Sequence, residues 1–190
     1  GWRAGSESGR KPKVPLLNRQ LLLFAVLGLS VGCDQATKQL ATATLKGEPM
    51  RSFLGDTFRL TWATNYGAFL SLGTNLPPGL RFLLLTVAVG ALLLGIVIFT
   101  ATSAKLDSAQ VAGYAMIAGG GLSNWIDRAR YDGEVVDFMN LGLGRLRTGI
   151  FNVADLAIVA GIGFLFFAGW KHDRAEKQKK ALQPPPAAAP

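Results

Sequence analysis

The sequence predicts an all-α membrane protein with four transmembrane helices and a small extracytoplasmic loop that contains β-strands. Two observations carry this prediction. Of the 190 residues, 49% are hydrophobic, and they gather in long uncharged runs. A soluble domain would instead place charges on the solvent face of every helix. Basic residues also flank the first and last runs, as they do at the cytoplasmic ends of membrane spans.

The apolar runs give four candidate spans. The first lies between Arg19 and Lys38, and it reaches the roughly 20 residues that a span needs only if it includes Asp34. The others cover residues 82–104, 108–126 and 148–170. Only the last of these three contains an acid, Asp155. A cleavable signal peptide is the alternative for the first run, and residues 30–33 (SVGC) resemble a weak lipobox. Three further spans argue against that alternative.

The connections between the spans differ in length. Residues 102–108 form a short connection, which predicts an antiparallel hairpin of the second and third spans. Residues 39–79 form a long one. Within it, residues 58–72 are rich in Thr, Leu and aromatic side chains, which predicts short strands.

We interpret the chain as a single membrane domain. Residues 1–15 are a basic cytoplasmic tail, residues 16–170 a four-helix catalytic core, and residues 171–190 a disordered, basic, Pro/Ala-rich cytoplasmic tail. Four spans place both termini on one side, and the positive-inside rule makes that side the cytoplasm. Basic residues clustered in tails favour anionic lipid over nucleic acid, because a nucleic-acid-binding domain carries its charge on a folded face.

The supply of reactive side chains limits the chemistry. Cys33 is the single cysteine and His172 the single histidine. An intrachain disulfide, a cysteine metal cluster, a histidine zinc site and a Ser-His-Asp triad are therefore excluded or nearly so. Hydrolytic chemistry would have to come from carboxylates.

The acids fall at one face of the predicted bundle. Asp34, Asp127 and Asp155 lie at the outer ends of their spans, and Asp137 lies in the loop between the last two spans. Acids within spans are costly and usually mark function. Asn124 precedes Asp127 by three residues, as another asparagine precedes Asp155, and this spacing places each pair on one helix face.

Structural explanations exist for two of these acids. Asp127 can form an interfacial ion pair with Arg128, and Asp34 can extend to the outer surface. Asp137 lies in an apolar stretch, which predicts a segment that dips into the membrane beside a site. Two close carboxyl groups share a proton and can activate water for peptide hydrolysis. A proton-coupled transporter would use similar acids, so both functions stay open at this point.

Five stretches resemble, in order, the motifs of the lipoprotein signal peptidases (signal peptidase II), which are aspartyl intramembrane proteases. They are residues 34–38 (DQATK), 65–68 (NYGA), 119–128 (GGGLSNWIDR), 133–138 (GEVVDF) and 151–155 (FNVAD). The resemblance implies an aspartyl endopeptidase of the bacterial inner membrane that removes signal peptides from diacylglyceryl-modified prolipoproteins, cutting before the lipidated cysteine. It implies no metal or cofactor, and its partners are prolipoprotein substrates and membrane lipid. We expect a monomer with no nucleic-acid partner.

The resemblance also implies roles for individual residues. Asp137 and Asp155 correspond to the catalytic pair. The supporting polar residues correspond to Asp34, Lys38, Asn65, Asn124, Asp127, Arg128 and Asn152. The active site would lie near the extracytoplasmic face, with both termini in the cytoplasm.

Two positions depart from the family pattern. Residues 69–70 (FL) stand where the family has Ala-Phe, and Ser123 replaces a glycine, a change that we expect to have little effect. The first departure keeps open an inactive relative that only binds precursors.

Overall fold

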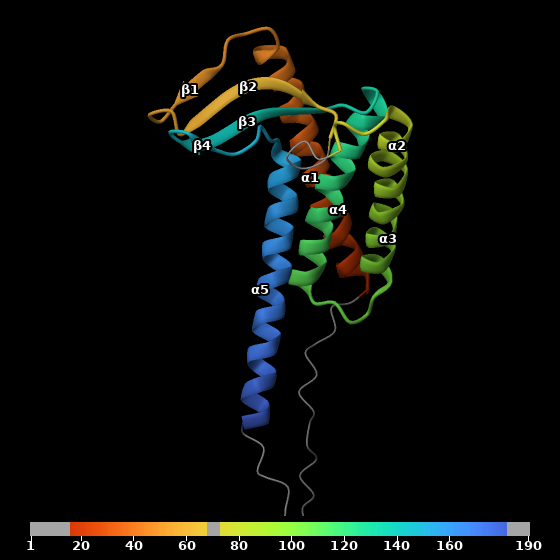
Figure 1. The fold of residues 1–190 in the computed structure, drawn as a ribbon. Coiled ribbons are helices and arrows are strands. Elements are labelled where there is room, and N and C mark those ends of the chain that lie inside the picture. The colour runs from red at the N-terminus through yellow and green to blue at the C-terminus, as the bar shows by residue number, and fades with distance from the viewer. Residues whose placement is uncertain (1–15, 68–72, 182–190) are drawn as a thin grey trace, which may run out of the picture.

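A computed structural model of the chain describes residues 16–67 and 73–181. Four long helical segments stand side by side in this part of the chain, and a small sheet lies across one end of them (Figure 1). These segments are α1 (Leu16–Leu45), the continuous helix α2 (Pro78–Phe82), η2 (Leu83–Ala88) and α3 (Val89–Thr102), then α4 (Ser108–Arg130) and α5 (Val153–Ala181). The stretch η2 is π-helical.

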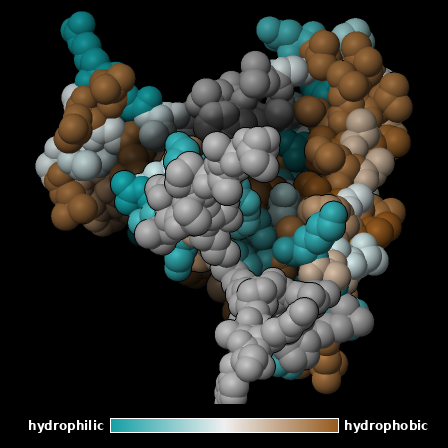
Figure 2. Space-filling view, turned by 90° about the horizontal axis from the view of Figure 1, so that it is seen from below, coloured by the Kyte–Doolittle hydropathy of each residue, from teal (hydrophilic) through white to brown (hydrophobic). Residues whose placement is uncertain are grey.

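Three of the four helical segments are long and apolar enough to cross a membrane. They cover Leu17–Leu45, Pro78–Thr102 and Val153–Gln178. Hydrophobic residues lie on the outer sides of the molecule when it is viewed along the helices (Figure 2). α4 is not among the three, because it carries several small and polar residues. The prediction of four transmembrane helices is therefore confirmed in part, as four helices with three candidate spans.

The central position of α4 explains its composition. It packs against α1, α3 and α5, so its polar side chains meet protein rather than lipid. A Cβ atom at Gly119 would lie 2.7 Å from the Cβ of Ser30 in α1, and one at Gly120 would overlap the carbonyl of Ala154 in α5. These glycines let the helices approach closely.

The ends of the helices differ from the predicted ends. α1 continues to Leu45, so the connection to the next helix is shorter than residues 39–79. α5 continues to Ala181, so the disorder expected from residue 171 onward is wrong up to that point. The extension is rich in Lys, Arg, Glu, Gln and Ala, which favour helix. Residues 1–15 and 182–190 lie outside the described residues.

The predicted hairpin of the second and third helical segments is confirmed. α3 ends at Thr102, and α4 begins at Ser108 after a capping box, in which Asp107 and Gln110 each bond the other's backbone amide. At this end of the bundle the buried guanidinium of Arg19 donates to the carbonyl oxygens of Ala101, at 2.7 Å, and Ser103. The start of α1 is thereby tied to the end of α3.

A four-stranded antiparallel sheet lies at the other end. Its strands are β1 (Arg51–Phe53), β2 (Phe58–Asn65), β3 (Val135–Leu143) and β4 (Leu146–Arg147), in that order. β2 confirms the strands expected within residues 58–72, of which residues 68–72 lie outside the described residues.

β3 contains the stretch around Asp137, for which the sequence predicts a segment that dips into the membrane. It is a strand, and its first four residues are buried against the helix ends. Phe138 packs with Ala41 and Leu45 of α1. The apolar character of this stretch therefore comes from a sheet that covers the bundle.

Candidate active site

Asp137 lies on β3 beside an irregularity in the sheet. Asp137 pairs with Ala63 and Met139 with Leu60, so β2 has one more residue than β3 over this interval. Such bulges bend a strand and redirect side chains, and they are common next to active sites. On its other side β3 pairs with Phe151, whose amide donates to the Met139 carbonyl at 2.8 Å. This pairing brings the start of α5 next to Asp137.

Asp155 is positioned by the start of α5. The side-chain oxygen of Asn152 accepts from the Asp155 amide at 3.0 Å, and the Asp155 carboxylate accepts from the Asn152 amide at 3.1 Å. This reciprocal pair is a capping box formed by Asn and Asp, and it satisfies two amides that the first turn of a helix leaves free. The three-residue spacing of the FNVAD stretch thus fixes the Asp155 side chain at the helix N-terminus.

The two acids are linked through asparagines. Asn152 Nδ2 donates to Asp137 Oδ1 at 2.6 Å, so Asn152 contacts both carboxylates. Asn124 Nδ2 donates to the other oxygen of Asp155, Oδ1, at 3.1 Å, and Asn152 also donates to Asn124 at 3.1 Å. Asp137 is 4% exposed, whereas Asp155 is half-buried. β3, α4 and α5 therefore converge on one pair of carboxyl groups.

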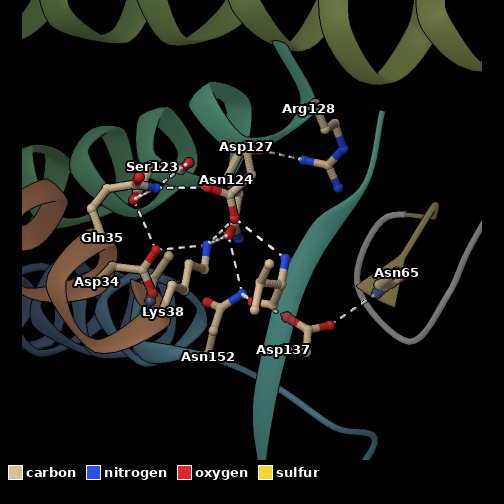
Figure 3. A network of polar contacts seen from close by, with 12 residues as sticks. Asp34, Gln35, Lys38, Asn65, Ser123, Asn124, Asp127, Arg128, Asp137 and Asn152 are labelled. Atoms are coloured by element: carbon tan, nitrogen blue, oxygen red, sulfur yellow. Dashed lines mark hydrogen bonds and ion pairs between the residues drawn. The ribbon is translucent and has the colours of Figure 1, made fainter. Parts of the chain in front are cut away.

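Lys38 is the centre of a second, adjoining network (Figure 3). Its ammonium lies 2.7 Å from each of three oxygens, on Asp34, Asp127 and Asn124. Three partners use all three donors of a lysine. The ion pair expected between Asp127 and Arg128 is thus wrong, because the ion-pair partner of Asp127 is Lys38. Asp127 also accepts from the amide of Val136 at 3.3 Å, which ties α4 to β3.

The sequence allowed Asp34 to extend to the outer surface, and this structural explanation is wrong. Asp34 is fully buried. Its Oδ1 accepts from the Ala154 amide in α5 at 2.8 Å, and its Oδ2 accepts from the Ser123 hydroxyl at 2.8 Å. The residue carries a charge that α1, α4 and α5 jointly satisfy.

Sequence reasoning missed two members of this network, Gln35 and Ser123. Gln35 Nε2 donates to Asp127 at 2.7 Å and to the Ser123 hydroxyl at 3.0 Å. Ser123 is fully buried, and its hydroxyl reaches Asp34. The Ser123 hydroxyl thus takes part in the network, whereas we expected from the sequence that a serine in place of glycine would have little effect. The one available indication was the position of Ser123 directly before Asn124.

Asn65 and Arg128 lie at the edge of the site toward the outer loop. Asn65 Nδ2 is 3.4 Å from Asp137 Oδ2, and its oxygen accepts from the Gly67 amide at 2.8 Å. Arg128 donates to the Gly67 carbonyl at 2.7 Å. The two residues hold the end of β2 and Gly67 beside Asp137.

The carboxyl pair opens into an apolar cavity of about 320 Å³. Its lining includes Asn65, Asn124, Arg128, Asp137 and Asp155 together with Val135, Leu141, Ile150, Phe151, Leu156 and Val159. Burial, reinforced by the nearby charge of Asp155, raises the pKa of Asp137 to about 7. A protonated acid and an adjacent carboxyl group in an apolar cavity can perform general acid–base hydrolysis of an apolar substrate.

The comparison with family models decides the assignment. The model of the family described as signal peptidase (SPase) II matches residues 26–171, well over half of the chain. The chain belongs to the signal peptidase II family. As a member of this family, it is an aspartic-type peptidase and a multi-pass membrane enzyme. Family membership therefore decides between the two functions that the acids left open, in favour of the peptidase and against the transporter.

Relatives of this signal peptidase II carry the same assignment. The lipoprotein signal peptidase of Thermosynechococcus vestitus is 37% identical over 78% of this chain and 91% of its own length. That of Acaryochloris marina is 33% identical over 85% and 96%. A bacterial membrane enzyme solved by the in meso method at 2.3 Å resolution shares the fold with a TM-score of 0.64, at 25% identity over 84% of this chain and 91% of that one.

The structure brings together all nine site residues that the sequence singles out in this signal peptidase II. They form two connected groups. Around the carboxyl pair lie Asn65, Asn124, Arg128, Asp137, Asn152 and Asp155, and around the buried ammonium lie Asp34, Lys38 and Asp127. Asn124 belongs to both groups, because it contacts Lys38 and Asp155.

Proposed function

We propose that this signal peptidase II cleaves diacylglyceryl-modified prolipoproteins immediately before the lipidated cysteine, with Asp137 and Asp155 as its catalytic pair. The observation that carries the proposal is the contact of one asparagine, Asn152, with both carboxyl groups at the mouth of an apolar cavity. The relatives named lipoprotein signal peptidases support the substrate class.

The proposed reaction needs one water molecule between the two acids. Ionised Asp155 takes a proton from the water as its oxygen attacks the scissile carbonyl carbon, and protonated Asp137 gives its proton to the carbonyl oxygen. The tetrahedral intermediate then loses its carbon–nitrogen bond, and the leaving nitrogen receives the proton held by Asp155. As the carbonyl re-forms, one hydroxyl proton of the intermediate returns to Asp137, so both acids regain their starting state. The products are a signal peptide with a new carboxyl group and a lipoprotein with a free amino group. The raised pKa of Asp137 supports its role as the acid.

Asparagines and arginine complete the proposed site. Asn124 and Asn152 orient the two carboxyl groups through the bonds described above. Asn65 orients the second oxygen of Asp137. Arg128 braces Gly67, just after β2. Apolar surface beside the pair takes the acyl chains of the substrate.

The membrane arrangement follows from the same proposal. α4 also crosses the membrane, as the third of four spans, both termini lie in the cytoplasm, and the sheet and carboxyl pair lie at the extracytoplasmic face. The basic residues that flank the first and last spans support this orientation. A monomer suffices for the proposed reaction, because one chain supplies both carboxyl groups and the asparagines that contact them.

A lipidated peptide tests the function directly. The purified protein is expected to cut a peptide with a diacylglyceryl-modified cysteine at the bond before that cysteine, and mass spectrometry of both products locates the cut. The same peptide with an unmodified cysteine is the control, and it is expected to be cut far more slowly. Equal cleavage of both peptides, or a cut elsewhere, would contradict the proposed substrate class.

The protonation of Asp137 predicts the pH dependence of the reaction. A carboxyl group with a pKa raised to about 7 holds its proton below that pH and loses it above. We expect kcat/KM to fall about tenfold for each pH unit above about 7, because the general acid becomes ionised. Unfolding measured on both sides of this pH separates loss of the proton from loss of the fold. A rate that stays constant through this interval would remove Asp137 as the proton donor.

A further inference from the structure

A second apolar groove leads away from the carboxyl pair. It has a volume of about 400 Å³ and runs between the η2–α3 helix and α5, with α4 as its floor. One end reaches Asp155. Its walls include Leu85 and Val89 on one side, Ile158 and Ile162 on the other, and Gly121 on the floor.

One hydrogen bond fixes the η2 wall of this groove. The indole Nε1 of Trp125, on α4, donates to the backbone carbonyl of Thr86 at 2.9 Å. Thr86 lies in the π-helical stretch, next to the groove residue Leu85. π-Helical turns are rare in proteins, and those that occur are often found at functional sites. Thr86 is 8% exposed, so solvent offers this carbonyl little replacement for the bond.

The contact of Trp125 with η2 is possible because α3 has a glycine, Gly90, beside the indole. A Cβ atom at Gly90 would lie 2.8 Å from Trp125 Nε1, closer than real Cβ contacts. The indole therefore lies directly against the α3 backbone. Trp125, lying against the backbone at Gly90, is thus one of the side chains that set the distance between the η2–α3 wall and the α4 floor.

We infer that Trp125 is a specificity-determining residue, which sets the width of this groove so that it accepts one straight acyl chain of the substrate. The inference rests on the proposed function. The size of the groove selects this occupant over a helical peptide. A helix with side chains is at least about 10 Å across, so roughly 400 Å³ would hold only about one turn of it. An extended hydrocarbon chain fits along the walls.

Substrates with different acyl chains test the inference. Lipidated peptides of one sequence carry either straight saturated chains or chains with methyl branches, and kcat and KM are measured for each. Trp125→Phe keeps the ring and removes the N–H, and Gly90→Ala displaces the indole. Both variants are expected to improve the relative kcat/KM for branched chains about tenfold, the low end of what one carbon decides in an apolar pocket. The change should appear in KM rather than kcat.

The matched control also removes an indole N–H group, but from a tryptophan that lies away from the groove. Trp62 Nε1 donates to the Thr42 hydroxyl at 3.1 Å, and Trp62→Phe is expected to leave the chain preference at the wild-type value. Cleavage of the straight-chain peptide by the wild type tests the proposed function separately, because the inference is read only from the ratio of the two substrates. If Trp125→Phe and Gly90→Ala both keep the wild-type ratio, Trp125 only packs the helices and the inference is wrong.

Discussion

Asp137→Asn and Asp155→Asn are each expected to lower kcat for a lipidated precursor peptide by about a thousandfold or more, within the range that general acid–base groups contribute. Asparagine keeps the size of the side chain but can neither hold the transferred proton nor accept one. KM should change little, because the apolar walls of the cavity are untouched. Single-turnover cleavage measured over long incubations would quantify the residual rate.

The double variant sharpens this prediction. Residues that act as a unit are not additive, so Asp137→Asn combined with Asp155→Asn should be hardly slower than either single variant. Asp132→Asn is the matched control, because Asp132 is an exposed loop acid with a positive φ that asparagine adopts readily. It should retain wild-type kcat. If either single variant cleaves as fast as the wild type, the proposed pair is wrong.

Lys38→Met is expected to reduce the free energy of unfolding by about 3–5 kcal/mol, the usual cost of leaving a buried charge without its partner. Lys38 is 4% exposed and lies 2.7 Å from both Asp34 and Asp127. Without its ammonium, two buried carboxylates would face each other with no cation between them. Thermal or denaturant unfolding in detergent measures the loss.

A control and a rescue show whether charge causes this loss. Lys46→Met removes an ammonium that lies 4.8 Å from the ring centre of Trp62 at an exposed position, and it should cost less than about 1 kcal/mol. Adding Asp34→Asn and Asp127→Asn to Lys38→Met should recover part of the stability, because no unpaired charge then remains. If Lys38→Met unfolds like the wild type, the network around Lys38 contributes little to the fold.

The sequence predicts the helices because apolar runs have a direct physical meaning in a membrane. It also predicts that the acids share one end of the bundle, because the topology alternates from span to span. It could not predict β3. The first four residues of β3 are buried, and a buried strand has the same apolar run as a membrane segment.

Partners within the site were harder to predict than the site itself. The spacing of Asn124 and Asp127 shows that they share a helix face, but not that Asn124 bonds Asp155 on another helix. Asp127 has an arginine next to it in sequence, yet its ion-pair partner is Lys38. Neighbours in sequence point about 100° apart on a helix, whereas contacts between helices depend on packing that spacing alone does not encode.

The way Asp34 is satisfied has a consequence during synthesis. Its carboxylate on α1 takes one hydrogen bond from the backbone of Ala154, at the start of α5, which the ribosome makes after α1, α3 and α4. The same turn supplies Asn152 and Asp155. A nascent chain that lacks α5 therefore has neither a complete acid pair nor a fully paired Asp34. With Asp137 and Asp155 as the proposed catalytic pair, proteolytic activity would arise only after the start of α5 has been made and has packed against α1 and β3.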